Sequence, residues 1–98
     1  SRGPADLVMA LALVHHLAIS NNLPFSHIAM FLSKICRNLI IEFVPKSDSQ
    51  VQKLLKSRED IFPNYNQDSF EKELRNFFSI EKISNVEGSK RIIYLMTT

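Results

Sequence analysis

The stretch that decides the fold of this 98-residue chain is Asp6-Leu7-Val8-Met9-Ala10-Leu11-Ala12-Leu13-Val14-His15-His16. One carboxylate opens it, an apolar run follows, and two histidines close it. A short apolar run does not by itself separate helix from strand, and Leu, Ala and Met favour a helix by propensity. The residues that follow favour a strand over Leu7–Val14, buried on both faces as in a parallel sheet. The histidines then lie at the carboxyl end of this strand, where ligands bind in open α/β sheets.

A helix and a second strand follow the histidines. Pro24 is well placed for the first turn of a helix. The apolar residues of this segment recur at helical spacing and give it one buried face: Phe25, Ile28, Ala29, Leu32, Ile35 and Cys36. Arg37-Asn38 closes the helix, and Leu39–Val44 is rich in β-branched residues before Pro45. Because a helix connects the two strands, we expect them to be parallel, with a right-handed crossover.

Two more helices and a hairpin complete the predicted order. Ser47-Asp48-Ser49-Gln50 reads as a capping box, with Ser47 as the cap of a helix that ends near Arg58. Asn66 is expected to cap a third helix, whose first turn contains Asp68. Two strands, Ile80–Val86 and Arg91–Met96, are joined by the short turn Glu87-Gly88-Ser89, which predicts an antiparallel hairpin.

The predicted fold class is therefore α/β, in the order β-α-β-α-α-β-β. Two parallel strands precede the C-terminal antiparallel hairpin, and about three helices cover the faces of the sheet. This is a partial, Rossmann-like, three-layer fold in a single domain over residues 1–98.

Composition excludes several classes of function. The formal charge is only +2, which is too small to indicate binding to nucleic acid or to an anionic membrane. No apolar run reaches the roughly 20 residues of a spanning helix. The single cysteine, Cys36, excludes an internal disulfide and predicts a reducing, cytoplasmic location. Residues 1–4 have no initiator methionine and no cleavage pattern, which predicts a piece of a larger protein without a signal peptide.

The order of parts resembles the C-terminal half of class I S-adenosylmethionine-dependent methyltransferases. In that family the strand order is 3-2-1-4-5-7-6, and these four strands would be the fourth to the seventh, in the order 4-5-7-6. Asp6–Leu17 resembles the fourth-strand motif, Leu39–Pro45 resembles the fifth strand, and Asp68–Ile80 resembles the last helix and sixth strand.

A more particular resemblance is to bacterial nodulation-related methyltransferase-like proteins. It is carried by three blocks, Ala10–Leu17, Ile40–Lys46 and Arg58–Pro63. The chain departs from the family in one respect: its two glycines, Gly3 and Gly88, form no glycine-rich turn. The family builds most of its cofactor site from a first half that this chain lacks.

The resemblance implies a function for the parent protein, the transfer of a methyl group from S-adenosylmethionine to a small-molecule or macromolecular acceptor. It places the backbone of Ala12, Leu13 and Val14 beside the cofactor. His16 falls on the family's histidine position and is the first candidate for the catalytic base, with His15 as the alternative. On a regular strand, two adjacent histidines point to opposite faces, so only one of them would face the pocket.

Four more residues are predicted to line a substrate pocket: Glu42, Lys46, Phe62 and Tyr65. A carboxylate inside an apolar strand needs a partner, so Glu42 either faces a polar cleft or pairs with Lys46 or Arg37. The loop Asp60–Tyr65 carries large apolar residues, which predicts that it folds over a core or a pocket. Adjacent histidines do not have the spacing of zinc ligands, and no metal is expected.

An alternative hypothesis belongs to a different class. The chain could be a truncated or degenerate methyltransferase half that acts as an interaction module. Without the first three strands of the family, the Leu7–Val14 strand has an unpaired apolar edge. Such an edge predicts pairing with a partner or a homodimer.

Overall fold

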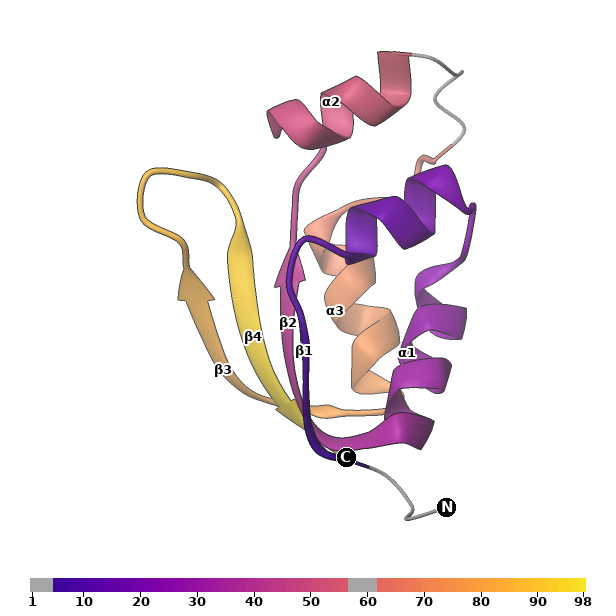
Figure 1. The fold of residues 1–98 in the computed structure, drawn as a ribbon, viewed down its shortest axis with the longest axis vertical. Coiled ribbons are helices and arrows are strands. Elements are labelled where there is room, and N and C mark those ends of the chain that lie inside the picture. The colour runs from indigo at the N-terminus through magenta and orange to yellow at the C-terminus, as the bar shows by residue number, and fades with distance from the viewer. Residues whose placement is uncertain (1–4, 57–61) are drawn as a thin grey trace.

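The computed structural model describes residues 5–56 and 62–98. Four strands and four helical segments follow one another along the chain (Figure 1). Their bounds are β1 (Ala5–Ala10), the π-helix η1 (His16–Ser20), α1 (Phe25–Ile35), β2 (Cys36–Phe43), α2 (Ser49–Lys56), α3 (Gln67–Arg75), β3 (Ser79–Asn85) and β4 (Ile92–Thr97).

The four strands form one mixed sheet in the order β1-β2-β4-β3. β1 runs parallel to β2, with Val8 paired to Leu39, as the connecting helix predicts. β4 lies between β2 and β3 and is antiparallel to both. The parallel pair, the terminal hairpin and the strand order are thus confirmed.

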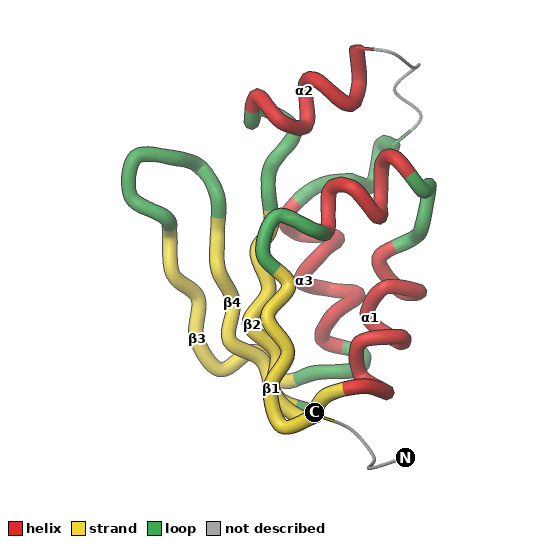
Figure 2. Tube along the Cα trace, in the orientation of Figure 1, coloured by secondary structure: helices red, strands yellow, loops and turns green. Residues whose placement is uncertain are grey.

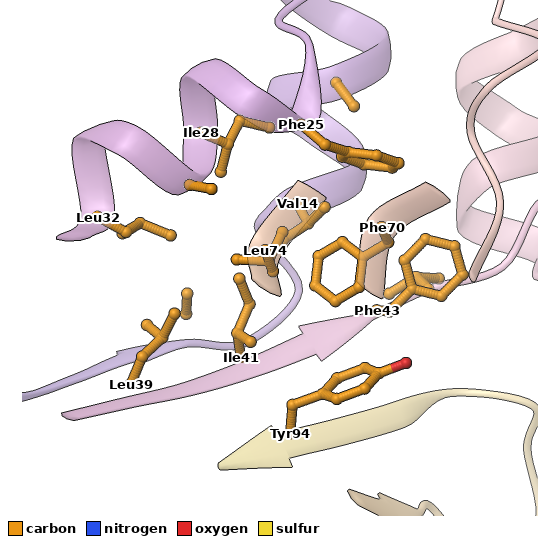
Figure 3. Packing of buried hydrophobic residues seen from close by; sticks show 14 of the residues in the cluster. Val14, Phe25, Ile28, Leu32, Leu39, Ile41, Phe43, Phe70, Leu74 and Tyr94 are labelled. Carbon is orange, nitrogen blue, oxygen red and sulfur yellow. The ribbon is translucent and has the colours of Figure 1, made fainter. Parts of the chain in front are cut away.

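The core lies between the sheet and the helices α1 and α3. The side chains that fill it come from both layers (Figure 3): Val14, Phe25, Ile28, Leu32, Leu39, Ile41, Phe43, Phe70, Leu74 and Tyr94. The predicted buried face of α1 is confirmed for Phe25, Ile28, Ala29 and Leu32, whereas Cys36, which was also assigned to it, belongs to β2. Asn66 caps α3 as predicted, since its side-chain oxygen accepts the Ser69 N–H at 2.8 Å.

The predicted strand Leu7–Val14 is wrong at its carboxyl end and in its burial. β1 stops at Ala10, a turn follows, and Val14 and His15 are already helical (Figure 2). Val14 is fully buried there. β1 is also an edge strand, so Leu7 and Met9 are half exposed rather than buried. A turn over residues 11–13 and a helix from Val14 thus replace the end of the predicted strand.

The predicted third layer is absent from the described part of the chain. Figure 1 shows α1 and α3 on the same face of the sheet and α2 beyond the carboxyl end of β2, and no described helix covers the other face. The physical reason is the direction of the chain. Both helices belong to connections that advance the same way across the sheet from β1, so they fall on one side.

Two boundaries also differ from the prediction. Arg37 and Asn38 belong to β2 rather than to the end of α1. α2 is capped by Asp48 instead of Ser47, because Asp48 Oδ1 accepts the Gln50 N–H at 2.9 Å. Arg58, where this helix was expected to end, and residues 60–61 of the predicted loop lie outside the described residues. None of the described helices is long and apolar enough to span a bilayer.

Candidate functional site

A cluster of charged side chains lies at the carboxyl end of β2. Arg91 donates two hydrogen bonds to Asp48, from Nε to Oδ2 at 2.9 Å and from Nη2 to Oδ1 at 3.1 Å. Its Nη1 also lies 3.9 Å from Glu42 Oε1. Such a bidentate pair fixes both the distance between the guanidinium and the carboxylate and the relative orientation of their planes. One guanidinium thereby balances two carboxylates that come from different elements.

Local backbone structure positions each member of the cluster. Glu42 lies near the end of β2, and Asp48 follows at the start of α2. Arg91 comes just before β4, after a turn in which Gly88 has φ +79°, a conformation that favours glycine. The Arg91 N–H donates to Ser89 Oγ at 3.1 Å, which holds the end of this turn.

Glu42 has a second partner, the turn that follows β1. The Ala12 N–H donates to Glu42 Oε1 at 2.8 Å. Ala12 has φ +54°, in the left-handed region that costs an L-residue roughly 1–2 kcal/mol. Glu42 is 7% exposed and Ala12 is exposed, so this hydrogen bond is partly buried. We infer that Glu42 stabilises the turn that ends β1 and brings the histidines to the site.

Ala12→Gly tests whether this turn is strained. Glycine adopts a positive φ without steric cost, so we expect the free energy of unfolding to rise by about 0.5–1 kcal/mol. Chemical denaturation at neutral pH measures the change. The matched control is Ala5→Gly, because Ala5 is exposed in β1 and glycine lowers stability in a strand. A loss of stability in both variants would show that the backbone at Ala12 is not strained.

The two histidines occupy very different environments. His15 is 1% exposed, and its Nδ1 has no hydrogen-bond partner among the described residues. Burial lowers the pKa of His15, and the neighbouring His16 and Arg91 lower it further. His15 is therefore neutral at neutral pH. His16 is exposed, and its ring centroid lies 4.3 Å from that of His15.

Asp48 and Arg91 stabilise each other's charged form. The hydrogen bonds from Arg91 hold the pKa of Asp48 below its usual range, and Asp48 in turn raises the pKa of Arg91. This pair stays ionised at neutral pH and has a structural role. His16, by contrast, is exposed.

Of the three residues predicted to contact a cofactor, two are exposed and one is buried. Ala12 and Leu13 lie exposed in the turn after β1, at the carboxyl edge of the sheet. The side chain of Val14 is fully buried in the core, and the N–H of Ala12 is occupied by Glu42. The exposed side chains of this turn are those of Leu11, Ala12 and Leu13.

Phe62 and Tyr65 belong to the helical side of the molecule. Both are buried, and the Tyr65 hydroxyl donates to the Val44 carbonyl. Burial raises the pKa of this hydroxyl far above its usual range. Both residues also line a pocket of about 390 Å³ beside Pro24 and the start of α1. Neither histidine is among its lining residues, and neither are Glu42 and Lys46.

Lys46 lies in the link between β2 and α2. It is half buried, and its carbonyl accepts a hydrogen bond from the Gln52 side chain. The structure thus brings Ala12, His15 and Glu42 close to one another and places Lys46 on the segment that leads to Asp48. Among the described residues, no group of three or more His, Cys, Asp or Glu side chains could hold a metal ion.

Asp48 and Arg91 are the site residues that sequence reasoning missed. Asp48 was assigned only to a capping box, and Arg91 only to the start of a strand. The two are 43 positions apart, and their pairing depends on the insertion of β4 beside β2. The one available signal was Glu42, since a carboxylate in an apolar strand requires a cation.

Comparison with known proteins finds a relative that matches most of the chain. Over 94 residues the chain is 42% identical to the nodulation protein NoeA of Rhizobium meliloti (strain 1021). The chain is similar to a segment of a nodulation protein. The match covers 96% of this chain but 20% of that protein, so the chain spans about a fifth of the length of this curated relative. No family model matches the chain. The search of solved structures found no match either.

Proposed function

We propose that this chain forms the C-terminal part of an S-adenosylmethionine-dependent methyltransferase, with one wall of the cofactor pocket and the substrate side. The observation that carries the proposal is the sheet order β1-β2-β4-β3, with a parallel first pair. This order agrees with the family order 4-5-7-6 implied by the sequence resemblance. The similarity to a nodulation protein is in keeping with the more particular resemblance.

The residues present fit one wall of a cofactor site. Leu13 is 39% exposed in a turn at the carboxyl edge of the sheet, and Glu42 holds the backbone of that turn in place. The other wall needs a glycine-rich turn, and the chain's two glycines, Gly3 and Gly88, do not form one. The 98-residue chain alone is therefore not expected to be active. When bound, S-adenosylmethionine supplies an electrophilic methyl group.

His16 is the proposed catalytic base. Its exposed imidazole accepts the proton that the acceptor nucleophile loses as it attacks. His15 acts through position: buried and neutral, it packs against the His16 ring and adds no positive charge beside it.

The substrate side is proposed to lie around Glu42, Lys46, Phe62 and Tyr65. Glu42 is committed to Ala12 and Arg91, so it orients the site rather than contacting the acceptor freely. Phe62 and Tyr65 line a separate pocket beside the start of α1, which would hold part of the acceptor. The acceptor is a small molecule or a macromolecule that presents a nucleophilic atom to the sulfonium methyl group.

Leu13→Lys tests the proposed wall. We expect the complete translation product that contains these residues to bind S-adenosylmethionine, and this variant to bind it at least about tenfold more weakly. The reason is that lysine places a cation beside a sulfonium ion. The matched control is Met30→Lys on α1, because Met30 is 40% exposed and Leu13 is 39% exposed. Isothermal titration calorimetry measures both affinities.

Two results would contradict the proposal. The first is the absence of any heat of binding when the complete product is titrated with S-adenosylmethionine. The second is equal weakening by Leu13→Lys and Met30→Lys, since that would show a general effect of charge. Circular dichroism of both variants confirms that they are folded before binding is compared.

A further inference from the structure

The pocket of about 390 Å³ on the helical side of the molecule is separate from the charged cluster around Arg91. Its described walls come from three segments: the stretch from η1 to the first turn of α1, the turn over residues 62–65, and one face of α3. Figure 1 shows α1 and α3 side by side with their first turns at the same end of the helical layer, which brings these segments together. Neither β1 nor the open face of the sheet contributes to this described lining. A pocket of this size holds a small organic molecule.

One part of the pocket wall is aromatic. Phe25, Phe62 and Tyr65 line it, and each of these residues is buried. The ring centroids of Phe25 and Tyr65 lie 5.5 Å apart. The Tyr65 hydroxyl donates to the Val44 carbonyl, so the polar end of this ring already has its partner. Such a surface favours contact with an apolar group of a ligand, and above all with a flat ring.

Two opposite charges line the same pocket. Lys72 and Glu73 lie on the face of α3 that also carries Ser69, as expected for positions three and four residues apart. In the described part of the chain, the Lys72 ammonium has no ion-pair or hydrogen-bond partner. The Glu73 carboxylate accepts a long hydrogen bond from Asn76, at 3.4 Å, and does not pair with Lys72. Each charge is therefore available to an opposite charge on a ligand.

Uncharged polar side chains complete the lining. Asn22 and Asn64 are exposed at the pocket, and Ser26 and Ser69 are half-buried in it. Amides and hydroxyls can both donate and accept hydrogen bonds, and they leave the net charge of the described lining at zero. The matching ligand thus has one positive group, one negative group and an apolar ring.

We propose that this pocket binds a free α-amino acid with an aromatic side chain. The ring of the amino acid packs on the aromatic part of the wall, its carboxylate pairs with Lys72, and its ammonium group pairs with Glu73. As a description of the methyl acceptor, this inference rests on the proposed function, because it gives the substrate side a chemical class. The binding itself requires no S-adenosylmethionine.

Four small molecules test the three parts of this recognition separately. We expect the complete translation product that contains these residues to bind L-phenylalanine in equilibrium dialysis without S-adenosylmethionine. Phenylacetate lacks the ammonium group and phenethylamine lacks the carboxylate, so each should bind at least about fivefold more weakly, as expected for the loss of one partly exposed ion pair. Glycine lacks the ring and should bind at least about tenfold more weakly.

Lys72→Met and Glu73→Gln assign the two charges to the ligand groups. Lys72→Met should lower the affinity for L-phenylalanine about fivefold without weakening phenethylamine, which has no carboxylate to lose. Glu73→Gln should lower the affinity for L-phenylalanine without weakening phenylacetate. Lys53→Met on α2 and Glu81→Gln on β3 are the matched controls, because both residues are exposed and lie outside the pocket, and they should leave the affinity for L-phenylalanine unchanged.

Three outcomes would overturn the proposal. The absence of saturable binding of L-phenylalanine at millimolar concentration excludes the amino-acid site. A partial probe that binds as tightly as L-phenylalanine excludes recognition of the group that this probe lacks. Equal effects of the pocket variants and the control variants place the binding elsewhere in the complete product. Because binding of S-adenosylmethionine is measured separately with Leu13→Lys, failure of one proposal is distinguished from failure of the other.

Discussion

Phe70→Ala is expected to lower the free energy of unfolding by about 4 kcal/mol. Phe70 is fully buried, and its ring centroid lies 5.1–5.4 Å from those of Phe25, Phe43 and Tyr94. The substitution removes the ring that joins α3 to α1, β2 and β4. Since a domain of this length has a stability of roughly 5–15 kcal/mol, the loss is a large share of the total.

Thermal denaturation followed by circular dichroism measures this effect. Phe70→Leu is the graded comparison, because leucine keeps most of the buried volume but loses the ring contacts, and we expect it to cost only about 1–1.5 kcal/mol. If the melting temperature of the alanine variant falls no further than that of the leucine variant, the ring of Phe70 does not hold the core together as proposed.

Arg91→Met is expected to lower stability by about 2 kcal/mol at neutral pH. The variant leaves Asp48 and Glu42 without their cation, and hydrogen bonds to charged groups are worth roughly 1.5–3 kcal/mol. We keep to the lower half of that range because the Arg91 side chain is 25% exposed and solvent screens the pair. The neighbouring exposed residue provides the control, since Lys90→Met should leave the unfolding midpoint in urea unchanged.

The same cluster makes the unchanged chain less stable in acid. The folded-state pKa of His15 lies below its ordinary value of 6.5, so its neutral form is favoured and stability falls as the pH drops below 6.5. The folded-state pKa of Asp48 lies below 3.8, so its contribution is present above that pH and is lost as the pH falls further. Urea denaturation between pH 7 and pH 3 should show both steps in the unchanged chain and a weaker second step in Arg91→Met. Equal second steps would contradict the role of Arg91.

The sheet was predictable because its signals are local. Leu39–Val44 is rich in β-branched residues, and the turn around Gly88 joins two strand-like segments, so β2 and the hairpin follow from short-range patterns. The helical connection between β1 and β2 makes that pair parallel. The end of β1 was not predictable in the same way. It depends on the hydrogen bond from Ala12 to Glu42, two residues that are 30 positions apart.

The candidate site was predictable in its position and only partly in its members. Strand ends gather polar residues at one edge of a sheet, which led to His15, His16 and Glu42. Which histidine is exposed depends on the helical turn that replaces the end of the predicted strand. Arg91 could not be assigned because its contact with Asp48 exists only once β4 has paired with β2.

The carboxylate of Glu42 also links parts of the chain that are far apart in the sequence. It accepts a hydrogen bond from Ala12, and Arg91 links it to Asp48 at the start of α2. The turn after β1, the end of β2, the start of α2 and the residue before β4 are thus connected by one set of hydrogen bonds and ion pairs. Local opening of the hairpin would remove the cation and leave Glu42 with an unbalanced charge, which loosens its hold on the turn before the histidines. We therefore expect the turn before the histidines and the last strand to open together.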